Sequence, residues 1–331
     1  MPKALHPDIV LHQETGDSAF FHGVTPCEHY AGDEKKLRKA LALQRDLLGV
    51  FDVTADLEDG AAAGREDETA RALAGILAES RPDHHRVGCR VHPVDHPAFA
   101  GDIATLLGTV RDRLAYLTIP KIAGIEQLNH AVASIDEQAT RHGIPPPPLQ
   151  VLIEDEAALH EVFAIAAHPR IHFIAFGQMD FTSSHRGAIP AEAMKSPGQF
   201  DHPLMRRAKC EIAAACHAHG KVPTHNPTTD YASPTQAAAD AARAKNEFGF
   251  TRMWSIHPQQ IQQIVGVFAP SAAQIEDASR ILLAAQAADW GPIADRGLLH
   301  DRASYRFFWN LLKQAHQMRR TIPESAQRAF F

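Results

Sequence analysis

Two acidic residues follow two consecutive apolar runs in the middle of the chain, where their side chains can do chemistry together. Glu154 comes directly after VLI, and Asp180 follows HFIAF after three intervening residues. Carboxylate oxygens are hard ligands, and a pair that leaves open positions for substrate suits a divalent cation, of which Mg²⁺ is the best match. A purely structural alternative makes Glu154 and Asp155 helix caps and Asp180 an acid in a loop.

The elements around these residues are predicted to bring both carboxylates to one edge of a sheet. Short runs rich in β-branched and aromatic residues, without a 3.6-residue period, predict strands that are buried on both faces of a parallel sheet. The segment AALHEVFAIAA between them predicts the crossover helix that parallel strands require. Because such crossovers are right-handed, the ends of both strands lie on the same side of the sheet.

Strand and helix patterns alternate along the rest of the chain and predict eight strand–helix units. Such alternation predicts an all-parallel sheet, and eight units predict an α/β fold of the closed (β/α)8 TIM-barrel type. A doubly wound open sheet is the alternative, and the absence of GxGxxG after the first strand disfavours a dinucleotide site. A long loop is expected over 181–202. The predicted strands are 18–23, 50–59, 86–93, 115–121, 149–153, 171–176, 221–227 and 250–258.

Every predicted strand ends in a polar or ionisable residue, at the end of the barrel where such enzymes keep their chemistry. These residues exceed what helix capping needs, so a functional site is expected there. The strand ends carry His22, Glu58 with Asp59, Arg90 with His92, Lys121, Glu154, Asp180, His225 with Asn226, and Ser255 with His257.

These residue types suit chemistry at a 2-oxo or 2-hydroxy carboxylate. A metal ion chelates one carboxylate oxygen and the adjacent oxygen, and it polarises the carbonyl group. Arg90 is then expected to stabilise the alkoxide or enolate that develops beside it. Making or breaking the neighbouring C–C bond also needs a group that exchanges a proton with the carbanion. Aldol or Claisen-type chemistry follows, whereas phosphoryl transfer fits less well without a Gly-rich phosphate cradle.

The composition predicts a soluble enzyme of the cytoplasm. A chain of 331 residues with 45% apolar content can bury a large core, and a net charge of −6 argues against a nucleic-acid partner. The sequence has neither a signal-peptide pattern nor an apolar stretch of membrane-spanning length. Its four cysteines lack CxxC spacing, which predicts reduced, structural thiols.

Six motifs in fixed order resemble those of the citrate lyase β-subunit-like and malyl-CoA lyase branch of the HpcH/HpaI aldolase superfamily. They are DVTADLEDGAAAGREDETAR (52–71), CRVHP (89–93), IPK (119–121), LIED (152–155), FGQMD (176–180) and WSIHPQQI (254–261). The resemblance implies a (β/α)8 barrel, a Mg²⁺ ion held by Glu154 and Asp180, and Arg90 at the substrate oxygens. It also implies that Glu58 and Asp59 lie near the metal and support its water shell.

The resemblance also suggests where the catalytic base comes from. Family members that act on free pyruvate and aldehydes carry "EH" where this chain has Glu58-Asp59, and that His is their base. Here the base must come from elsewhere. The stretch HDRASYR (300–306) is similar to the "ED.AT.R" stretch of malate synthases, whose Asp abstracts the methyl proton of acetyl-CoA. Asp301 is therefore the hypothesised proton-transfer residue, and the alternative is an N-cap of the following helix.

Two further residues are interpreted as lying at the substrate. Lys121 either neutralises charge in the site or forms a purely structural pair with an acid such as Glu58. His257, in the IHP motif, is expected to orient the last loop by hydrogen bonding.

In malyl-CoA lyases an acid comparable to Asp301 reaches into the site of the neighbouring subunit, so the resemblance implies the same arrangement here.

The predicted function is a Mg²⁺-dependent carbon–carbon lyase that acts on a 3-hydroxyacyl-CoA of the malyl, citramalyl or citryl type and releases a 2-oxo acid. Residues 1–290 are expected to form the barrel, and 291–331 a helical lid and oligomerisation segment of a homotrimer or homohexamer. Family members that use CoA commonly begin with an "RS.LfvP" strand, and GDSAFFHGVTP lacks its Arg. The alternatives are therefore a class II aldolase acting on a free 2-oxo acid without CoA, or a non-catalytic barrel that binds a dicarboxylate.

Overall fold

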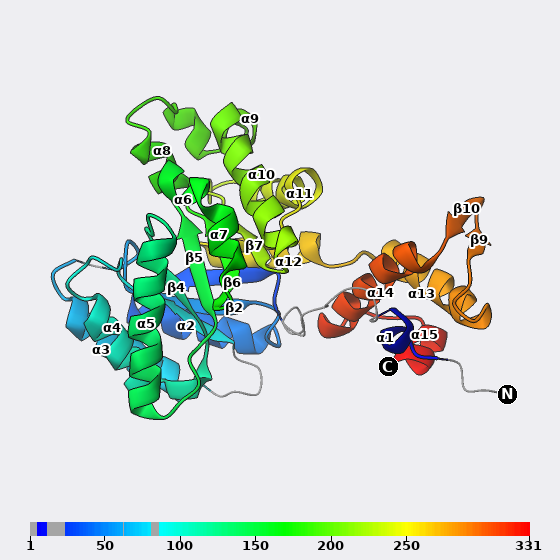
Figure 1. Cartoon of the computed structure of the whole chain (residues 1–331), viewed down its shortest axis with the longest axis horizontal. Coiled ribbons are helices and arrows are strands. Elements are labelled where there is room, and N and C mark those ends of the chain that lie inside the picture. Colours follow the sequence, from blue (N-terminus) through cyan, green and yellow to red (C-terminus); the bar gives the residue numbers. More distant parts are fainter. Residues whose placement is uncertain (1–4, 12–23, 62, 81–85) are drawn as a thin grey trace. The chain divides into compact units, whose positions relative to one another are not determined.

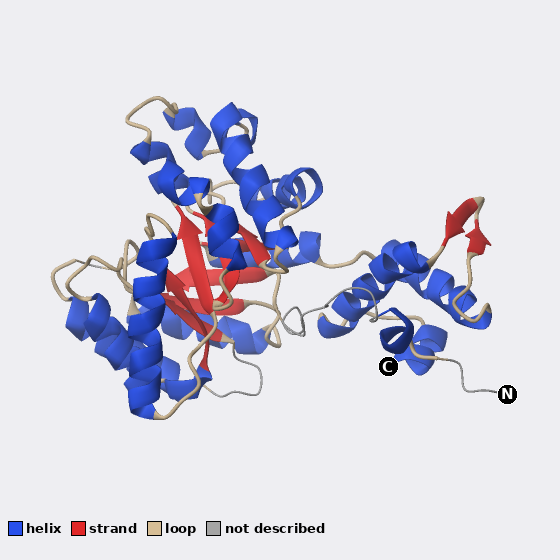
Figure 2. Ribbon diagram, in the orientation of Figure 1, coloured by secondary structure: helices blue, strands red, loops and turns tan. Residues whose placement is uncertain are grey.

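The computed structural model of the chain describes residues 5–11, 24–61, 63–80 and 86–331. The chain divides into two compact units, one made of Thr25–Phe268 and the other of Ala269–Phe331 with the N-terminal segment. In the larger unit, eight parallel strands close into a barrel in chain order, and helices cover its outside (Figure 1 and Figure 2). The predicted closed α/β barrel is thereby confirmed.

Strands and helices alternate through the larger unit. The strands are β1 (Cys27–Ala31), β2 (Asp52–Asp56), β3 (Val87–Arg90), β4 (Leu114–Ile119), β5 (Leu149–Ile153), β6 (Ile171–Phe176), β7 (Val222–His225) and β8 (Arg252–Ser255). Apart from three short helices within 178–201, the helices between and after them are α2 (Glu34–Asp46), α3 (Glu66–Glu79), α4 (Phe99–Thr109), η3 (Arg111–Arg113), α5 (Ile125–His142), α6 (Glu156–His160), α7 (Val162–Ala167), α10 (Pro203–Ala218), α11 (Gln236–Phe248) and α12 (Pro258–Phe268).

Local sequence signals set several of these helix ends. Asp33 caps α2 by accepting a hydrogen bond from the backbone N of Lys36. Gly143 and Gly249 end α5 and α11 in the left-handed conformation, which glycine adopts without steric cost.

In the described ranges, no helix combines the length and the apolar character needed to cross a membrane.

The first strand of the barrel differs from the predicted one. The segment SAFFHG (18–23), with His22, lies outside the described residues, and the first described strand of the barrel is CEHYA, β1. The apolar pattern missed β1 because Glu28 interrupts it with a charge. Inside the barrel that charge is paired, since Glu28 Oε2 and Asp52 Oδ2 each lie 3.0 Å from Arg252 Nη2. All three side chains are fully buried, and ion pairing is what makes such burial tolerable.

The segment expected as a loop over 181–202 contains short helices instead: α8 (Gln178–Ser184), η4 (Ala191–Met194) and α9 (Gly198–Asp201). The buried carboxylate of Asp240 holds this segment by accepting a hydrogen bond of 2.5 Å from Ser196. Gln178 Nε2 donates to the backbone O of Met194 over 2.8 Å. No local sequence pattern announces such contacts, which fix the position of α8, the helix that carries the second of the two acids.

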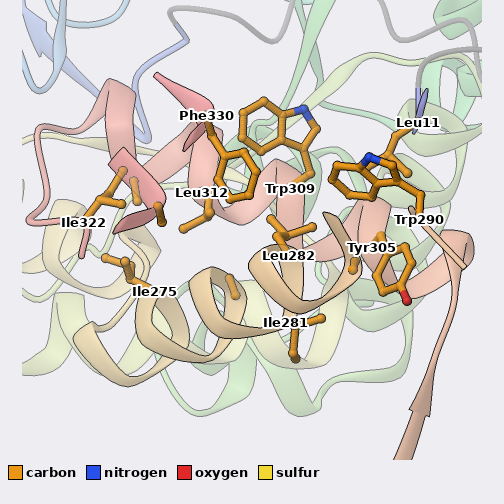
Figure 3. Close-up of a cluster of buried hydrophobic side chains, with 14 residues drawn as sticks. Leu11, Ile275, Ile281, Leu282, Trp290, Tyr305, Trp309, Leu312, Ile322 and Phe330 are labelled. Carbon is orange, nitrogen blue, oxygen red and sulfur yellow. The ribbon is translucent and has the colours of Figure 1, made fainter. Parts of the chain in front are cut away.

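The smaller unit has a hydrophobic core of its own. It contains α1 (Pro7–Leu11), α13 (Ala272–Ala287), the antiparallel strands β9 (Ile293–Asp295) and β10 (Leu298–His300), α14 (Arg302–Gln317) and α15 (Glu324–Phe330). Figure 3 shows its core side chains, which include Trp290, Tyr305, Trp309 and Phe330. The boundary was predicted after residue 290, but α13 packs into this core through Leu282, so the unit begins at Ala269. Helical periodicity does not reveal which of two cores an amphipathic helix faces.

Candidate active site

Glu154 and Asp180 both reach the loop that follows β4. Glu154 comes directly after β5, and Asp180 lies in the first turn of α8, which follows β6. The backbone N of Lys121 donates to Glu154 Oε2 over 2.6 Å, and Lys121 Nζ lies 3.7 Å from Asp180 Oδ1. Three neighbouring strand ends therefore meet at one residue, and the two acids face it together.

Gly177 makes room for Glu154. A Cβ atom at position 177 would lie 2.3 Å from Glu154 Cγ and 2.5 Å from Glu154 Oε1. Both distances are far inside van der Waals contact, and a close-packed interior has no free volume to absorb the displaced atoms. Any larger residue at this position would push the carboxylate aside, which gives the glycine of FGQMD a packing reason.

The ammonium group of Lys121 neutralises part of an acidic cluster. Its Nζ forms an ion pair with Glu58 Oε1 and lies 3.2 Å from Asp59 Oδ2, both in the loop after β2. Burial lowers the pKa of Lys121, but the hydrogen bond to Glu58 and the surrounding carboxylates outweigh this effect and raise the pKa above its ordinary value. The pairing between Lys121 and Glu58, one of the two roles expected for this lysine, is present.

Arg90, at the end of β3, is locked in place by two acids. Its Nε and Nη2 donate to the two oxygens of Asp56 over 2.7 and 2.6 Å, and its Nη1 lies 3.0 Å from Glu58 Oε2. The guanidinium carbon lies 5.3 Å from the ring centre of Tyr30, and only 6% of Arg90 is exposed. A bidentate pair of this kind fixes the plane of the guanidinium, so its remaining N–H groups point in set directions.

Asp56 is the residue of this cluster that sequence reasoning missed. It is the last residue of β2 and lies two positions after Thr54, so both face the barrel interior. Besides holding Arg90, it accepts hydrogen bonds from the backbone N of Glu58 (3.2 Å) and of Gly60 (3.0 Å), which shapes the loop. Asp56 is the first acid of DLED. Counting every second residue along the strand from Thr54 would have identified it as facing the barrel interior.

The Glu154–Asp180 pair has the properties of a site for a hard cation. Burial and then the charge of Asp180 raise the pKa of Glu154 to about 8, although Arg90 and the N–H of Lys121 oppose the shift. A divalent cation would stabilise both ionised carboxylates and remove this penalty. Among the described residues, no group of three or more His, Cys, Asp or Glu side chains is placed to hold a metal. A Mg²⁺ ion here would therefore take two protein ligands and complete its shell with water and substrate, which Mg²⁺ sites commonly do.

Two of the predicted site residues lie outside this group of contacts. His257 follows β8 and stacks on Tyr231, with ring centres 6.0 Å apart. Asp301, in the smaller unit, caps α14, because its Oδ1 accepts hydrogen bonds from the backbone N of Ala303 (2.9 Å) and Ser304 (3.4 Å). Its Oδ2 accepts none from any residue in the described ranges. The capping role is present, and a role in proton transfer stays a prediction.

Known proteins resemble this chain in both sequence and fold. Residues 37–258 match the HpcH/HpaI aldolase/citrate lyase family. The L-malyl-CoA/beta-methylmalyl-CoA lyase of Cereibacter sphaeroides (strain ATCC 17029 / ATH 2.4.9) is 30% identical over 285 residues, which cover 80% of this chain and 87% of that protein. A crystal structure of a citrate lyase from Burkholderia xenovorans LB400 is 47% identical, with a TM-score of 0.85 over 99% of this chain and 100% of that one.

A more distant structure shares the fold. The CitE protein of Mycobacterium tuberculosis, in complex with magnesium, acetoacetate and coenzyme A, has a TM-score of 0.67 at 21% identity, covering 88% of this chain and 98% of that one. The match of a family across most of the barrel agrees with the six motifs, which lie in this order at the ends of β2, β3, β4, β5, β6 and β8. The chain belongs to the HpcH/HpaI aldolase/citrate lyase family of carbon–carbon lyases.

Proposed function

We propose that this chain is a Mg²⁺-dependent lyase that cleaves a 3-hydroxyacyl-CoA of the malyl, citramalyl or citryl type into a 2-oxo acid and an acyl-CoA. The observation that carries the proposal is the meeting of Glu154 and Asp180 beside the locked Arg90–Asp56 pair. The name of the Cereibacter sphaeroides relative, a malyl-CoA lyase, supports the same substrate class.

Each residue of the cluster has a distinct part in the proposed reaction. Glu154 and Asp180 would hold Mg²⁺, and the bound ion would supply Lewis-acid polarisation at the hydroxy-carboxylate end of the substrate. Arg90 donates to the alkoxide oxygen from a guanidinium that Asp56 has already oriented, so no reorganisation is needed as charge develops. Lys121 holds Glu58 and Asp59 in place and limits the excess negative charge near the ion.

The proposed cleavage balances its protons and electrons. The 3-hydroxyl group loses its proton to solvent, and the bond between its carbon and the carbon next to the thioester breaks as the 2-oxo group forms. The bonding electrons pass into the thioester enolate. Protonated Asp301 then donates a proton to the enolate carbon, which releases the acyl-CoA. Asp301 then takes a proton back from solvent, which replaces the one released by the hydroxyl group, so the substrate and the two products have the same composition.

Cleavage assays with malyl-CoA, citramalyl-CoA and citryl-CoA test the proposed function. Trapping the released 2-oxo acid as a phenylhydrazone should show turnover of at least one thioester with Mg²⁺ and none with EDTA. If only a CoA-free 4-hydroxy-2-oxo acid is cleaved, the free 2-oxo acid aldolase is the correct assignment. If the protein binds a dicarboxylate but turns over none of these compounds, the non-catalytic, dicarboxylate-binding barrel is the correct assignment.

Asp301→Asn is expected to lower kcat by about 100- to 10,000-fold, the usual contribution of a positioned acid or base. Asn is as good an N-cap as Asp, so the fold should keep its melting temperature. Ser304→Ala is the matched control, because it removes the side chain that hydrogen-bonds the Asp301 backbone but leaves the carboxyl group. Full activity in Asp301→Asn would show that the proton comes from another group.

We further propose that the chain is a homo-oligomer in which Asp301 serves the barrel of a neighbouring copy. Mixing inactive Asp301→Asn with inactive Glu154→Gln should then restore part of the activity, because some sites combine a complete barrel with an intact Asp301. If the mixture stays inactive after subunits have exchanged, Asp301 does not act between copies.

A further inference from the structure

Lys121 has a backbone conformation that is costly for any residue with a side chain. Its φ is 50°, in the left-handed region, which residues other than glycine rarely adopt. In this conformation its backbone N–H donates to Glu154 Oε2 over 2.6 Å. A glycine could make the same hydrogen bond with less strain. The lysine therefore indicates that its side chain has a function of its own, as strained residues at functional sites often do.

The ammonium group of Lys121 lies between two sets of carboxylates. On one side it forms an ion pair with Glu58 and lies 3.2 Å from Asp59 Oδ2, both in the loop after β2. On the other side its Nζ lies 3.7 Å from Asp180 Oδ1, in α8, which is the longest of the three ion-pair distances. A lysine ammonium is a compact charge on a flexible stem, so it can move between such partners while the backbone stays in place.

The acids differ in what they lose if the ammonium moves. Glu58 has a second cation, because Arg90 Nη1 lies 3.0 Å from its Oε2. In the part of the chain that the structure describes, Asp180 has one ion pair, the one with Lys121. Its side chain is 38% exposed, so an ion from solvent can reach it. A divalent cation held by Asp180 would replace the ammonium there and repel it toward its other two partners.

We propose that the Lys121 ammonium competes with the divalent cation for the Asp180 carboxylate and withdraws to Glu58 and Asp59 when the ion binds. Lys121 thereby sets the affinity of the site for the free ion. The inference rests on the proposed function, because it needs the metal ion that Glu154 and Asp180 would hold. The ion is then held weakly until substrate oxygens complete its shell, and the acidic loops remain neutralised without it.

Isothermal titration of the wild type and of Lys121→Met with Mg²⁺ alone tests the competition. Met keeps a stem of similar length and removes the charge, so the variant should bind Mg²⁺ at least about tenfold more tightly, because like charges a few ångströms apart repel strongly. Lys221→Met is the matched control. Lys221 directly precedes β7, at the opposite end of the strands, and donates to the backbone O of His168, so the same loss of charge there should leave the Kd unchanged.

The outcomes separate this inference from the proposed function. If the wild type binds Mg²⁺ and Lys121→Met binds it equally or less tightly, the competition is overturned and the lyase proposal stands. If the wild type binds no Mg²⁺, the proposed function itself fails.

Crystals of the wild type grown with EDTA and with Mg²⁺ give a readout that does not depend on the folding of a variant. With Mg²⁺ bound, the Lys121 Nζ should lie beyond the ion-pair limit of about 4 Å from both carboxylate oxygens of Asp180 and stay in contact with Glu58 and Asp59. With EDTA it should contact all three acids. An ammonium that still pairs with Asp180 beside the bound ion would overturn the inference.

Discussion

A Glu154→Gln variant is expected to lose Mg²⁺ binding and, with it, lyase turnover. The amide keeps the shape of the side chain but lacks the charge that a hard cation requires. Affinity for Mg²⁺ should fall by at least about 100-fold, since even residues that only support a metal ligand contribute up to about 100-fold. Titration calorimetry with Mg²⁺ measures the first effect, and steady-state cleavage of the thioester measures the second.

Glu156→Gln is the matched control for this variant. Glu156 lies two residues further along the chain and contacts His185 and Arg207 instead of the acidic cluster. Its substitution should change neither Mg²⁺ affinity nor turnover. An unchanged Mg²⁺ affinity in Glu154→Gln would remove the basis of the metal site.

The pH dependence of stability gives Glu154→Gln a readout that does not need turnover. The pKa of Glu154 is about 8 in the folded protein, whereas an unfolded Glu has a pKa of roughly 4.3. Between these values the folded state holds a proton that the unfolded state has released, so the stability of the metal-free protein falls as pH rises. The variant lacks this loss. Without metal, the melting temperature of the variant minus that of the wild type should therefore be larger at about pH 8 than near pH 5. Mg²⁺ should raise the melting temperature of the wild type only.

Arg90→Gln is expected to lower kcat/KM by about 100- to 1000-fold, which is the range observed when one donor to a developing oxyanion is removed. The same change leaves Asp56 buried without its cation and removes one of the two cations beside Glu58. The free energy of unfolding should therefore fall by roughly 3–5 kcal/mol. Kinetics measured well below the melting temperature separate the loss of catalysis from the loss of fold.

The double variant Arg90→Gln/Asp56→Asn distinguishes a catalytic from a structural role of Arg90. Removing the carboxylate of Asp56 removes the charge that Arg90→Gln leaves unpaired, so part of the stability should return. Activity should not return, because no donor faces the substrate oxygen. Recovery of both stability and activity would mean that Arg90 serves only to neutralise Asp56.

The strands that carry the two acids were predictable because their signal is local. The run VLI and the residues FIAF (173–176) are buried in the barrel, and only the half-buried His172 at the start of the second run is polar. The right-handed crossover then dictates that Glu154 and Asp180 emerge at the same end of the barrel. That inference needs no knowledge of any other part of the chain.

The features that escaped prediction depend on partners that are distant in sequence. Glu28 interrupts the apolar pattern of β1, and only the hydrogen bond from Arg252, 224 residues later, explains how its charge is buried in a strand. Asp56 is one of three acids in DLED, and only the two hydrogen bonds that it accepts from Arg90, on the next strand, identify it as part of the site. Helix α13 has an ordinary amphipathic pattern, and only its packing shows that it belongs to the smaller unit.

Anomalous X-ray scattering from crystals grown with Mn²⁺ in place of Mg²⁺ tests most directly whether Glu154 and Asp180 share one ion. We predict a single strong peak about 2.1 Å from a carboxylate oxygen of each residue, with the remaining positions open to water or a 2-oxo acid. A peak that contacts neither residue, or no peak at a Mn²⁺ concentration that supports full turnover, would contradict the shared site.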